Sequence, residues 1–494
     1  MRINFLFALL ISFSATTFAQ DFRYGKVSVE ELQEQQHPLE PDADAAILYK
    51  EVISYVRRDG GEGYKVYYEI FERIKIYNNK GFDWATREIK LHKSSKDNDI
   101  LRQDKAAVYN LENGKVVSER LRNDGKFKEE SSRYADVVKF TLPGIKEGSV
   151  IEYSYIVASP YVMHVDEFKL QHDIPVNEVY VRFTTPEAFT YKTHQKGWLQ
   201  IPIKEQVKNT TVSGTVSGTT ETWGRGRSTG TATRTHLEVE KEKVIEVRMS
   251  NVPSLKDEPF ASNIHNYQSG VKFELSNVLF PNSPMQNFTI DWEGVAKQTY
   301  DNAFFGAELN KSGYFRKDID ALLSDIVAAD EKMIRIYEYV KQRMNWNGYT
   351  SQFTDLGVTT AYKDQVGSIA DINLMLTAML SYAGLEAYPV LLSTKSNGIP
   401  FFPTSNGFNY VIATAKVNGN FVLLDATDKN LIPNMLKDHT INWQGRIIRK
   451  DGASQWISLY GKEKSRINTM MQVEILNSFN VNGNVRKQYT EHFA

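Results

Sequence analysis

Residues 367–384 set the strongest limit on the architecture of this 494-residue chain, because they form one long apolar segment that leads directly into a strand-like stretch. Apolar side chains recur in this segment at three- and four-residue steps, which predicts a helix of about four turns with a buried face. Gly384 is the expected stop of the helix. Residues 387–393 follow with the composition of a buried strand. A helix followed so closely by a strand indicates an α+β domain.

A β-hairpin is predicted next, at residues 408–427, with its tight turn at Asn418-Gly419. Helix, strand and hairpin together resemble the core of the transglutaminase-like superfamily, which has a papain-like fold. The resemblance implies that active members carry a cysteine at the start of the helix. It also implies a histidine on the first strand of the hairpin and an aspartate on the second.

The resemblance also indicates which residues of this chain occupy the three catalytic positions. The family's Gly-x-Cys-x-Asp helix start aligns with residues 367–371, which places the cysteine position at Ile369. Its Phe-x-His-Val pattern aligns with residues 408–411, which places the histidine position at Tyr410. The aspartate position corresponds to Asp425. Two of the three positions therefore carry side chains that cannot perform the chemistry of the family.

Cysteine–histidine catalysis needs a thiolate and an imidazole that activates it. The chain contains no cysteine, and none of its nine histidines lies between His265 and His439, the interval that holds the predicted core. Nothing in the spacing of histidines and acidic residues indicates a metal site, and no motif indicates a cofactor. We therefore interpret the domain as a pseudoenzyme with no catalytic residue.

Ser368 is the one hydroxyl beside the vacated cysteine position. Its spacing to Asp371, ahead of an apolar run, is typical of a capping box, in which the hydroxyl accepts a backbone N–H. A serine nucleophile would need a positioned base, and Tyr410 is a poor one because its reference pKa is about 10. The sequence favours the cap. Asp425 is either a relic of the triad or, as we favour, a carboxylate that holds a turn.

The N-terminus has the three-part pattern of an export signal at residues 1–19. Its apolar segment, residues 5–12, is too short to span a membrane, and no other run approaches the necessary length. We expect an exported protein without a transmembrane span. The periplasm of a Gram-negative cell is the favoured location, with the cell surface or the medium as alternatives.

The first half of the chain predicts an all-β, sandwich-like domain. A polar lead-in at residues 20–46 precedes alternating strands at residues 47–284, among them a hairpin that turns at Asn113-Gly114. Residues 143–155 are similar to the hallmark of a β-rich domain of unknown function that precedes transglutaminase-like domains in exported bacterial proteins. This resemblance implies no activity. Residues 209–236 are rich in Thr, Gly and Ser and predict a mobile hairpin tip or insert.

The complete expectation is a multidomain α+β chain. Helices take over after residue 284, and residues 285–440 form the transglutaminase-like domain. Residues 441–494 contain two hairpins, the second turning at Asn482-Gly483, and predict the start of a C-terminal β domain. Because an isolated hairpin is only marginally stable, the sequence is expected to continue beyond residue 494.

Two classes of function remain open. Charge is balanced, with 59 Lys and Arg against 60 Asp and Glu, so nothing indicates nucleic acid or an anionic membrane as a partner. The first class is a non-catalytic module that binds an envelope protein, a peptide or a glycan. Its candidate cleft residues are Trp346, Tyr349, Ser368, Ile369, Tyr410 and Asp425. The second class is a residual hydrolase or transferase that acts on peptide amides or cell-wall peptides through Ser368. Turnover that Ser368→Ala abolishes would distinguish them.

Overall fold

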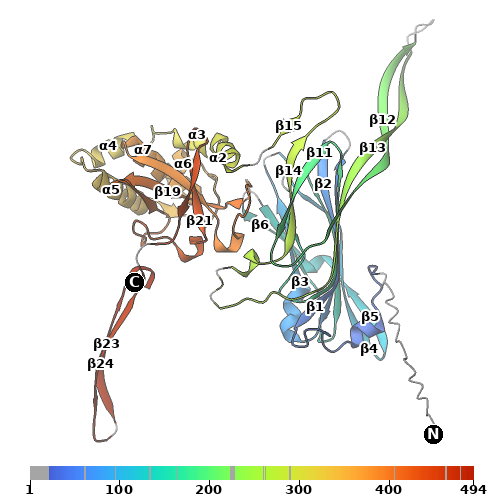
Figure 1. Ribbon diagram of the computed structural model, residues 1–494, viewed down its shortest axis with the longest axis horizontal. Coiled ribbons are helices and arrows are strands. Elements are labelled where there is room, and N and C mark those ends of the chain that lie inside the picture. The colour runs from blue at the N-terminus through green and yellow to red at the C-terminus, as the bar shows by residue number, and fades with distance from the viewer. Residues whose placement is uncertain are drawn as a thin grey trace, which may run out of the picture.

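The structure is a computed structural model. It describes residues 22–59, 63–94, 96–132, 135–163, 165–222, 228–259, 261, 263–288, 291–404, 407–461, 464–478 and 480–493. The export signal predicted at residues 1–19 lies outside this part of the chain. Figure 1 shows a β-rich N-terminal body, a mixed α/β body beside it, and a β-hairpin that leads away from the α/β body near the C-terminus.

The N-terminal β domain is built on one eight-stranded sheet with the order β12-β13-β10-β1-β2-β8-β4-β5. Its strands are β1 (Ala45–Arg58), β2 (Tyr64–Ile76), β4 (Ile100–Glu112), β5 (Lys115–Arg120), β8 (Val150–Ser159), β10 (Val176–Pro186), β12 (Ile203–Thr222) and β13 (Ser228–Val252). Neighbouring strands are antiparallel except β1 and β10, which pair in parallel with Ile47 opposite Val176. The hairpin turn predicted at Asn113-Gly114 joins β4 to β5, with positive φ angles of 51° and 74°.

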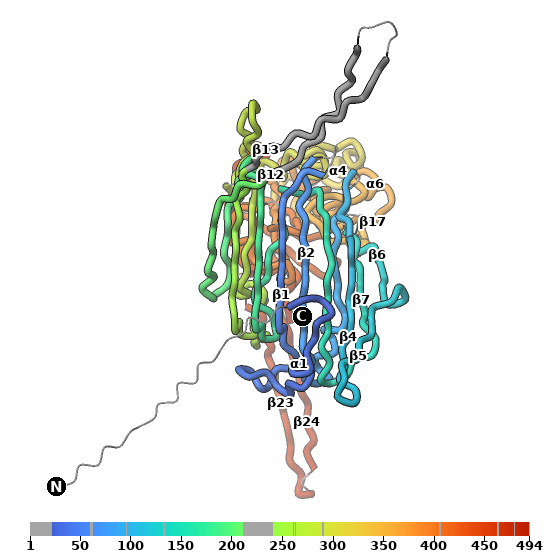
Figure 2. The backbone as a smooth tube through the Cα atoms, turned by 90° about the vertical axis from the view of Figure 1, so that its right-hand side faces the viewer, coloured from blue at the N-terminus to red at the C-terminus, as the bar shows by residue number. Residues whose placement is uncertain are grey.

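Smaller sheets cover the eight-stranded sheet and complete the core of the domain. They contain β3 (Thr86–His92), β6 (Lys126–Ser132), β7 (Ala135–Thr141), β9 (Phe168–Lys169), β11 (Phe189–Lys196), β14 (Gly270–Val278) and β15 (Gln286–Asn287). Figure 2 shows β3's partners β7 and β6 at one side of the long strands. Phe168, Phe183 and Phe273 pack between the layers, with the rings of Phe183 and Phe273 stacked at 4.5 Å between centroids. Alternating strands thus bury one face against another sheet, as the sandwich prediction requires.

The lead-in predicted at residues 20–46 contains a short helix, α1 (Val29–Gln33). Ser28 caps it in a complete capping box with Glu31. Glu31 also pairs with Arg73 of β2 at 2.8 Å, and Arg73 pairs on its other side with Glu152 of β8 at 2.6 Å. This buried ion network ties the lead-in to the sheet.

The insert predicted at residues 209–236 is β structure wherever the structure describes it. Strands β12 and β13 run through it as one long antiparallel hairpin, from Ile203 opposite Val247 to Thr222 opposite Ser228 (Figure 1). Residues 223–227, which hold the entire Gly-Arg-Gly-Arg sequence of the insert, lie outside the described residues.

The α/β domain has a five-stranded sheet with the order β20-β19-β18-β21-β22. Its strands are β18 (Glu386–Leu392), β19 (Tyr410–Val417), β20 (Asn420–Leu424), β21 (Gln444–Ile448) and β22 (Ser454–Ser458), and a separate pair is formed by β16 (Asn345–Trp346) and β17 (Val366–Gly367). Its helices are α2 (Trp292–Asp301), α3 (Gly306–Leu309), α4 (Arg316–Leu322), α5 (Ala329–Arg343), α6 (Val358–Asp364) and α7 (Ile369–Tyr382).

Helix α7 is the apolar helix predicted from the sequence. Its residues 369–380 are all buried, between the sheet on one side and α3, α5 and α6 on the other. Gly384 follows it with a φ of 83°, a backbone conformation that glycine adopts without strain, and ends the helix as predicted. The turn at Asn418-Gly419 joins β19 to β20 in the expected hairpin, with φ angles of 50° and 79°.

The domain boundary expected at residue 440 lies inside the five-stranded sheet. Strand β21 pairs with β18, with Val390 opposite Ile447, so residues 441–459 complete the α/β domain rather than open a new one. The hairpin prediction for these residues was right, but a hairpin pattern does not reveal which sheet it joins. Arg446 anchors the addition, since its guanidinium donates to Glu293 of α2 at 3.0 Å.

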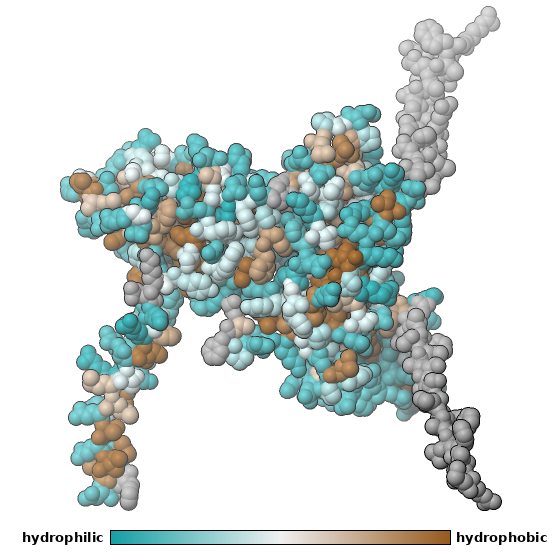
Figure 3. All heavy atoms as spheres, viewed as in Figure 1, coloured by the Kyte–Doolittle hydropathy of each residue, from teal (hydrophilic) through white to brown (hydrophobic). Residues whose placement is uncertain are grey.

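The last hairpin, β23 (Ile467–Ile475) and β24 (Val481–Tyr489), forms a two-stranded sheet of its own. Both strands are exposed along their described length, and apolar side chains are prominent on it (Figure 3). Within the described part of the chain, no helix combines the length and the apolar character that crossing a membrane requires.

Candidate functional site

The position that the family resemblance assigns to the catalytic cysteine lies at the N-terminus of α7. Ile369 is the first residue of the helix and is fully buried. Ser368, the N-cap, is also fully buried; its hydroxyl accepts the N–H of Asp371 at 3.2 Å and donates to Asp371 Oδ2 at 2.8 Å. The Ser368 hydroxyl therefore acts as both donor and acceptor within the cap, and it forms the capping box predicted from the sequence.

Asp371 is the hub of this helix start. Its carboxylate accepts the backbone N–H groups of Ser368 and Gly357, each at 2.9 Å, and those of Asp355 and Leu356 at 3.3 Å. Asp371 is fully buried. The loop before α6 is thus held against the start of α7 by one carboxylate, which is a structural role that the sequence pattern alone did not reveal.

Replacing Ser368 by alanine is expected to lower the free energy of unfolding of the α/β domain by about 1–2 kcal/mol, the usual cost of losing an N-cap. The reason is that the Asp371 N–H and one lone pair of its carboxylate lose their partner. Urea unfolding of wild type and Ser368→Ala measures the difference. Ser368→Thr is the control, since a threonine keeps the hydroxyl, and equal stability of all three proteins would contradict the capping role.

The other two triad positions are joined by a hydrogen bond. Tyr410, the first residue of β19, donates its hydroxyl to Asp425 Oδ2 at 2.8 Å, and both residues are fully buried. Asp425 Oδ1 accepts from the N–H and hydroxyl of Thr427 at 3.1 and 2.7 Å. Asn373 of α7 completes the set, because its Nδ2 donates to the same Oδ1 at 3.0 Å and its Oδ1 accepts the N–H of Ala426. The Asp425 carboxylate is therefore filled by protein donors.

Tyr410 cannot serve as a base near neutral pH. Burial raises the pKa of its phenol well above the usual value, and the neighbouring Asp425 carboxylate raises it further. The phenol stays protonated and remains a donor to Asp425. Tyr337 of α5 adds a second donor to this strand end, with its hydroxyl 3.0 Å from the Asp425 carbonyl oxygen. The geometry is that of a buried polar network, and Asp425 holds the turn as we favoured.

Sequence spacing missed His439, which lies beside Tyr410 with 6.1 Å between the ring centroids. Its imidazole is exposed, and partial desolvation together with the nearby Lys437 ammonium lowers the pKa below its usual value. The segment after β20 returns over the first strand of the hairpin and brings this histidine to the site. The sequence argument considered only the residues between His265 and His439, so it did not identify His439 itself as a neighbour of Tyr410.

The candidate cleft predicted from six residues needs correction. Ser368, Ile369, Tyr410 and Asp425 are fully buried, so no ligand reaches them in this conformation.

Trp346 and Tyr349 remain accessible, with 40% and 42% of their surface exposed. The two residues are joined by a hydrogen bond, because the indole N–H of Trp346 donates to the Tyr349 carbonyl at 2.9 Å. Tyr349 O also accepts the N–H of Ile369, which places the pair over the start of α7. The Lys437 ammonium lies 4.8 Å from the Trp346 ring centroid. We call Trp346, Tyr349 and Lys437 the aromatic platform.

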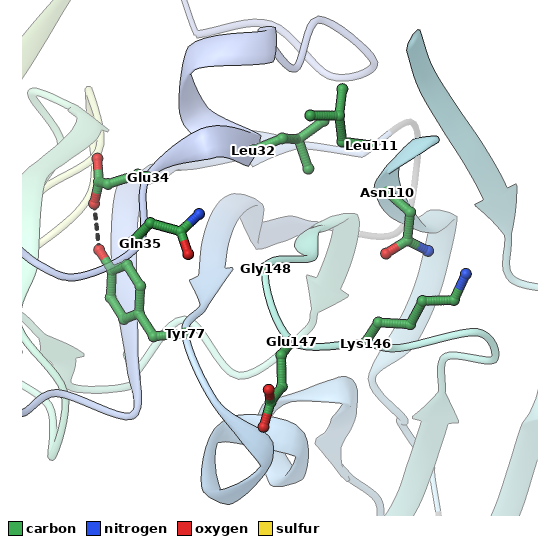
Figure 4. Close-up of a pocket in the computed structure, with 9 residues that line it drawn as sticks. All are labelled: Leu32, Glu34, Gln35, Tyr77, Asn110, Leu111, Lys146, Glu147 and Gly148. Carbon is green, nitrogen blue, oxygen red and sulfur yellow. Dashed lines mark hydrogen bonds between the residues drawn. The ribbon is translucent and has the colours of Figure 1, made fainter. Parts of the chain in front are cut away.

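Two cavities occur in the N-terminal β domain. The smaller, of about 370 Å³, is lined by polar groups from α1, the end of β2, β4 and the 146–148 turn (Figure 4). In it Tyr77 donates to Glu34, while Lys146 and Glu147 extend from the turn on the opposite side. Lys146 pairs with Glu112 at 3.0 Å, so this cavity is a largely self-satisfied polar surface.

The larger cavity, of about 790 Å³, has buried charges at its base. Lys50 Nζ lies 2.9 Å from His172 Nε2 and 3.2 Å from Glu72 Oε1, and Arg87 pairs with the same Glu72 carboxylate. We call it the Lys50 cavity. Burial, followed by the charges of Arg87 and Lys169, lowers the pKa of Lys50 to about 7, because Glu72 is shared with Arg87. Burial also lowers the pKa of His172 well below its usual value, so its imidazole is neutral.

The free energy of unfolding of this domain is expected to rise with pH between about 7 and 9, because Lys50 is then neutral when folded but protonated when unfolded, where its pKa is near 10.5. The unfolded chain binds one more proton than the folded protein in this window, so the free energy of unfolding rises by about 1 kcal/mol per pH unit. Below about pH 7 Lys50 is protonated in both states, and this gain in stability is absent. Glu72, Arg87, Lys169 and His172 are the charged or titratable groups around the amine. Hydrogen exchange of β1 and β2 peptides in urea at pH 7, 8 and 9 measures it, and Lys50→Met should flatten the slope. An equal slope in both proteins would refute the assignment.

No group of three or more His, Cys, Asp or Glu side chains in the described part of the chain has an arrangement that could hold a metal ion. The candidate sites among the described residues are the aromatic platform, above the start of α7, and the Lys50 cavity in the N-terminal β domain.

Comparisons with known proteins support the two-part organisation. The family model DUF3857, a domain of unknown function with a solved structure, matches residues 64–217, which include the hallmark at residues 143–155. No curated protein matches the chain. The crystal structure of a "putative protease" from Parabacteroides distasonis ATCC 8503 has a TM-score of 0.54 at 12% identity, over 84% of this chain and 72% of that one.

A "putative cysteine protease" from Cytophaga hutchinsonii is matched over 67% of this chain and 92% of that one, at 10% identity. Its TM-score of 0.19 is too low to carry an argument about the fold. The N-terminal β domain is thus similar to DUF3857, and the chain as a whole has the fold of the Parabacteroides distasonis protein.

Proposed function

We propose that this protein is a non-catalytic, exported transglutaminase-like protein whose α/β domain serves as a binding or scaffold module for a peptide, glycan or protein of the cell envelope. The observation that carries the proposal is the hydrogen bond from Tyr410 to Asp425 at 2.8 Å, with both residues fully buried. A phenol occupies the position of the family's imidazole and retains its contact to the aspartate. It keeps the structure of the triad while removing its base.

Three features of the site oppose the alternative of a residual hydrolase. The Ser368 hydroxyl is fully buried, and the Asp371 carboxylate to which it donates already accepts four backbone N–H groups, so the pair is engaged in the cap and out of reach of a substrate. The Asp425 carboxylate is occupied by Tyr410, Thr427 and Asn373. His439 is exposed at the edge of the site, and among the described residues no hydrogen bond links it to a hydroxyl that could act as a nucleophile.

The aromatic platform supports the binding role. Exposed aromatic rings stack on sugar rings or on the side chains of an extended peptide, and both rings remain available to solvent. The Trp346 indole is fixed by its hydrogen bond to Tyr349, so little conformational freedom is lost on binding. Lys437 packs on the Trp346 ring and faces Asp428 at 3.8 Å, so it helps to hold the indole in place.

Purified full-length protein is expected to show no turnover of transglutaminase, amidase or peptidoglycan-peptide substrates. Such chemistry requires a nucleophile and a base that a substrate can reach, and the hydroxyl–carboxylate pair at the start of α7, Ser368 and Asp371, is fully buried in the helix cap. Rates are measured for wild type, Ser368→Ala and His439→Ala under identical conditions. Turnover by wild type that either variant abolishes would establish the enzymatic alternative.

Binding is tested by crosslinking and pull-down from envelope extract. Trp346→Ala and Tyr349→Ala should lose a specific partner that wild type retains. Trp198→Ala is the matched control, because Trp198 is 63% exposed but lies in the N-terminal β domain. These variants are preferred to Tyr410→Ala, which would disrupt the core. The same partners in all four proteins would overturn the platform as the binding surface.

A further inference from the structure

The Lys50 cavity is built by parts of the chain that lie far apart in the sequence. Lys50 comes from β1, Glu72 from β2, Arg87 from β3 and His172 from the segment after β9, while the loop before β14 closes the cavity with Gln268. Its volume of about 790 Å³ lies in the range of small-molecule sites. A cavity assembled from five segments is a defined feature of the fold and not a groove along one strand.

Below about pH 7, where Lys50 is protonated, the base of the cavity has an excess of positive charge. The Lys50 and Arg87 side chains share one carboxylate, that of Glu72, which is 3% exposed. His172 contributes no negative charge, since its neutral ring faces the Lys50 ammonium at 2.9 Å. A buried cation without a full partner is costly, so this arrangement favours an anion that supplies the missing charge.

The walls and the opening narrow the choice of anion. Apolar and aromatic side chains line much of the cavity, among them Ile70, Tyr155 and Phe168. Four acidic residues at the cavity (Glu88, Asp166, Asp173 and Asp257) are exposed, so solvent screens them far more than the buried base. A fifth, Glu167, is half-buried and pairs with Lys196 at 3.0 Å. The ligand therefore needs an apolar body as well as a negative group.

Gln268 adds a further requirement. Its Nε2 donates to the Gln171 carbonyl, which fixes the orientation of the amide. Its Oε1 is buried and has no hydrogen-bond partner among the described residues, although Gln268 is 5% exposed. A buried acceptor without a partner is uncommon and is satisfied by a donor from water or a ligand.

We propose that the Lys50 cavity binds a small organic carboxylate with an apolar body and an amide N–H, the chemistry of an N-acylated amino acid. The carboxylate pairs with Lys50 and Arg87, the side chain packs on the apolar wall, and the amide N–H donates to Gln268 Oε1. This site belongs to the N-terminal β domain and is independent of the aromatic platform. An experiment that disproves binding at the Lys50 cavity therefore does not affect the proposal for the aromatic platform.

The test compares two probes on the wild-type protein by titration calorimetry at about pH 6, where Lys50 is protonated. N-acetyl-phenylalanine carries the carboxylate, and N-acetyl-phenylalaninamide is its neutral isostere of nearly the same shape. The acid is expected to bind at least about tenfold more tightly than the amide, since only the acid offsets the charge of the base. Equal affinities, or no binding of either probe at millimolar concentration, would overturn the proposal.

Two variants with opposite expected effects on the affinity for the acid extend the test. Lys50→Met should weaken binding of the acid by about tenfold or more, whereas Glu72→Gln should tighten it because the internal competitor is gone. Lys115→Gln is the control, since Lys115 is an exposed cation on β5 and does not line the cavity; its affinity should equal that of wild type. Loss of affinity in Glu72→Gln that has retained its fold by circular dichroism would contradict the charge argument.

Discussion

An alanine at position 371 is expected to lower the free energy of unfolding of the α/β domain by about 3 kcal/mol or more. The Asp371 carboxylate accepts the Ser368 and Gly357 N–H groups at 2.9 Å in a fully buried site. Each buried donor left without a partner costs about 1–3 kcal/mol, and the Ser368 hydroxyl loses its acceptor as well. Urea unfolding of the purified variant measures the change.

Asp371→Asn is the matched control for this prediction. An asparagine keeps the volume and one acceptor oxygen but places an NH₂ group against backbone donors, so an intermediate loss is expected. Asp371→Ala should also cost more than Ser368→Ala, because the cap is only one of the contacts that the carboxylate makes. Equal stability of Asp371→Ala and Ser368→Ala would show that the loop contacts contribute nothing.

Replacing Arg73 by methionine is expected to destabilise the N-terminal β domain by about 3–5 kcal/mol. The guanidinium is 1% exposed and lies between the buried carboxylates of Glu31 and Glu152. Removing it leaves two acids without their cation in a desolvated site, which is the costliest way to break a buried ion network. Denaturant unfolding, with hydrogen exchange of β2 and β8 peptides, measures the effect.

Two comparisons identify the cause. Arg58→Met changes an exposed arginine at the end of β1 and should alter stability by less than about 0.5 kcal/mol. Adding Glu152→Gln to Arg73→Met should recover part of the loss, because it removes one of the stranded charges. A double variant no more stable than Arg73→Met would argue against unpaired charge as the cause.

Local signals in the sequence were sufficient where the structure depends on neighbouring residues. The capping box at Ser368, the stop at Gly384 and the tight turns at Asn113-Gly114 and Asn418-Gly419 all form as predicted. Each depends on backbone conformations and hydrogen bonds within a few residues. The alternation of the N-terminal strands likewise predicted a sandwich-like domain.

Relations between distant segments could not be predicted in this way. The hairpin of β21 and β22 was recognised as a hairpin, but only the pairing with β18 shows that it belongs to the α/β domain. The short helix α1 was missed, although Ser28 and Glu31 have capping-box spacing, because its five residues show no helical periodicity. In the site, Asn373 was hidden inside an apolar run, and its buried contacts to Asp425 and Ala426 give no periodic signal.

The single parallel pairing in the eight-stranded sheet has a consequence for the order of folding. It divides the sheet into two antiparallel halves, one containing β1, β2, β8, β4 and β5 and the other β10, β13 and β12. Ile47 of β1 meets Val176 of β10 roughly 130 residues later in the chain, so closing this seam carries a high loop entropy. Until β10 arrives, β1 is an open edge that can pair with another chain. Refolding should therefore be slow, and the seam is where misassembly of this domain begins.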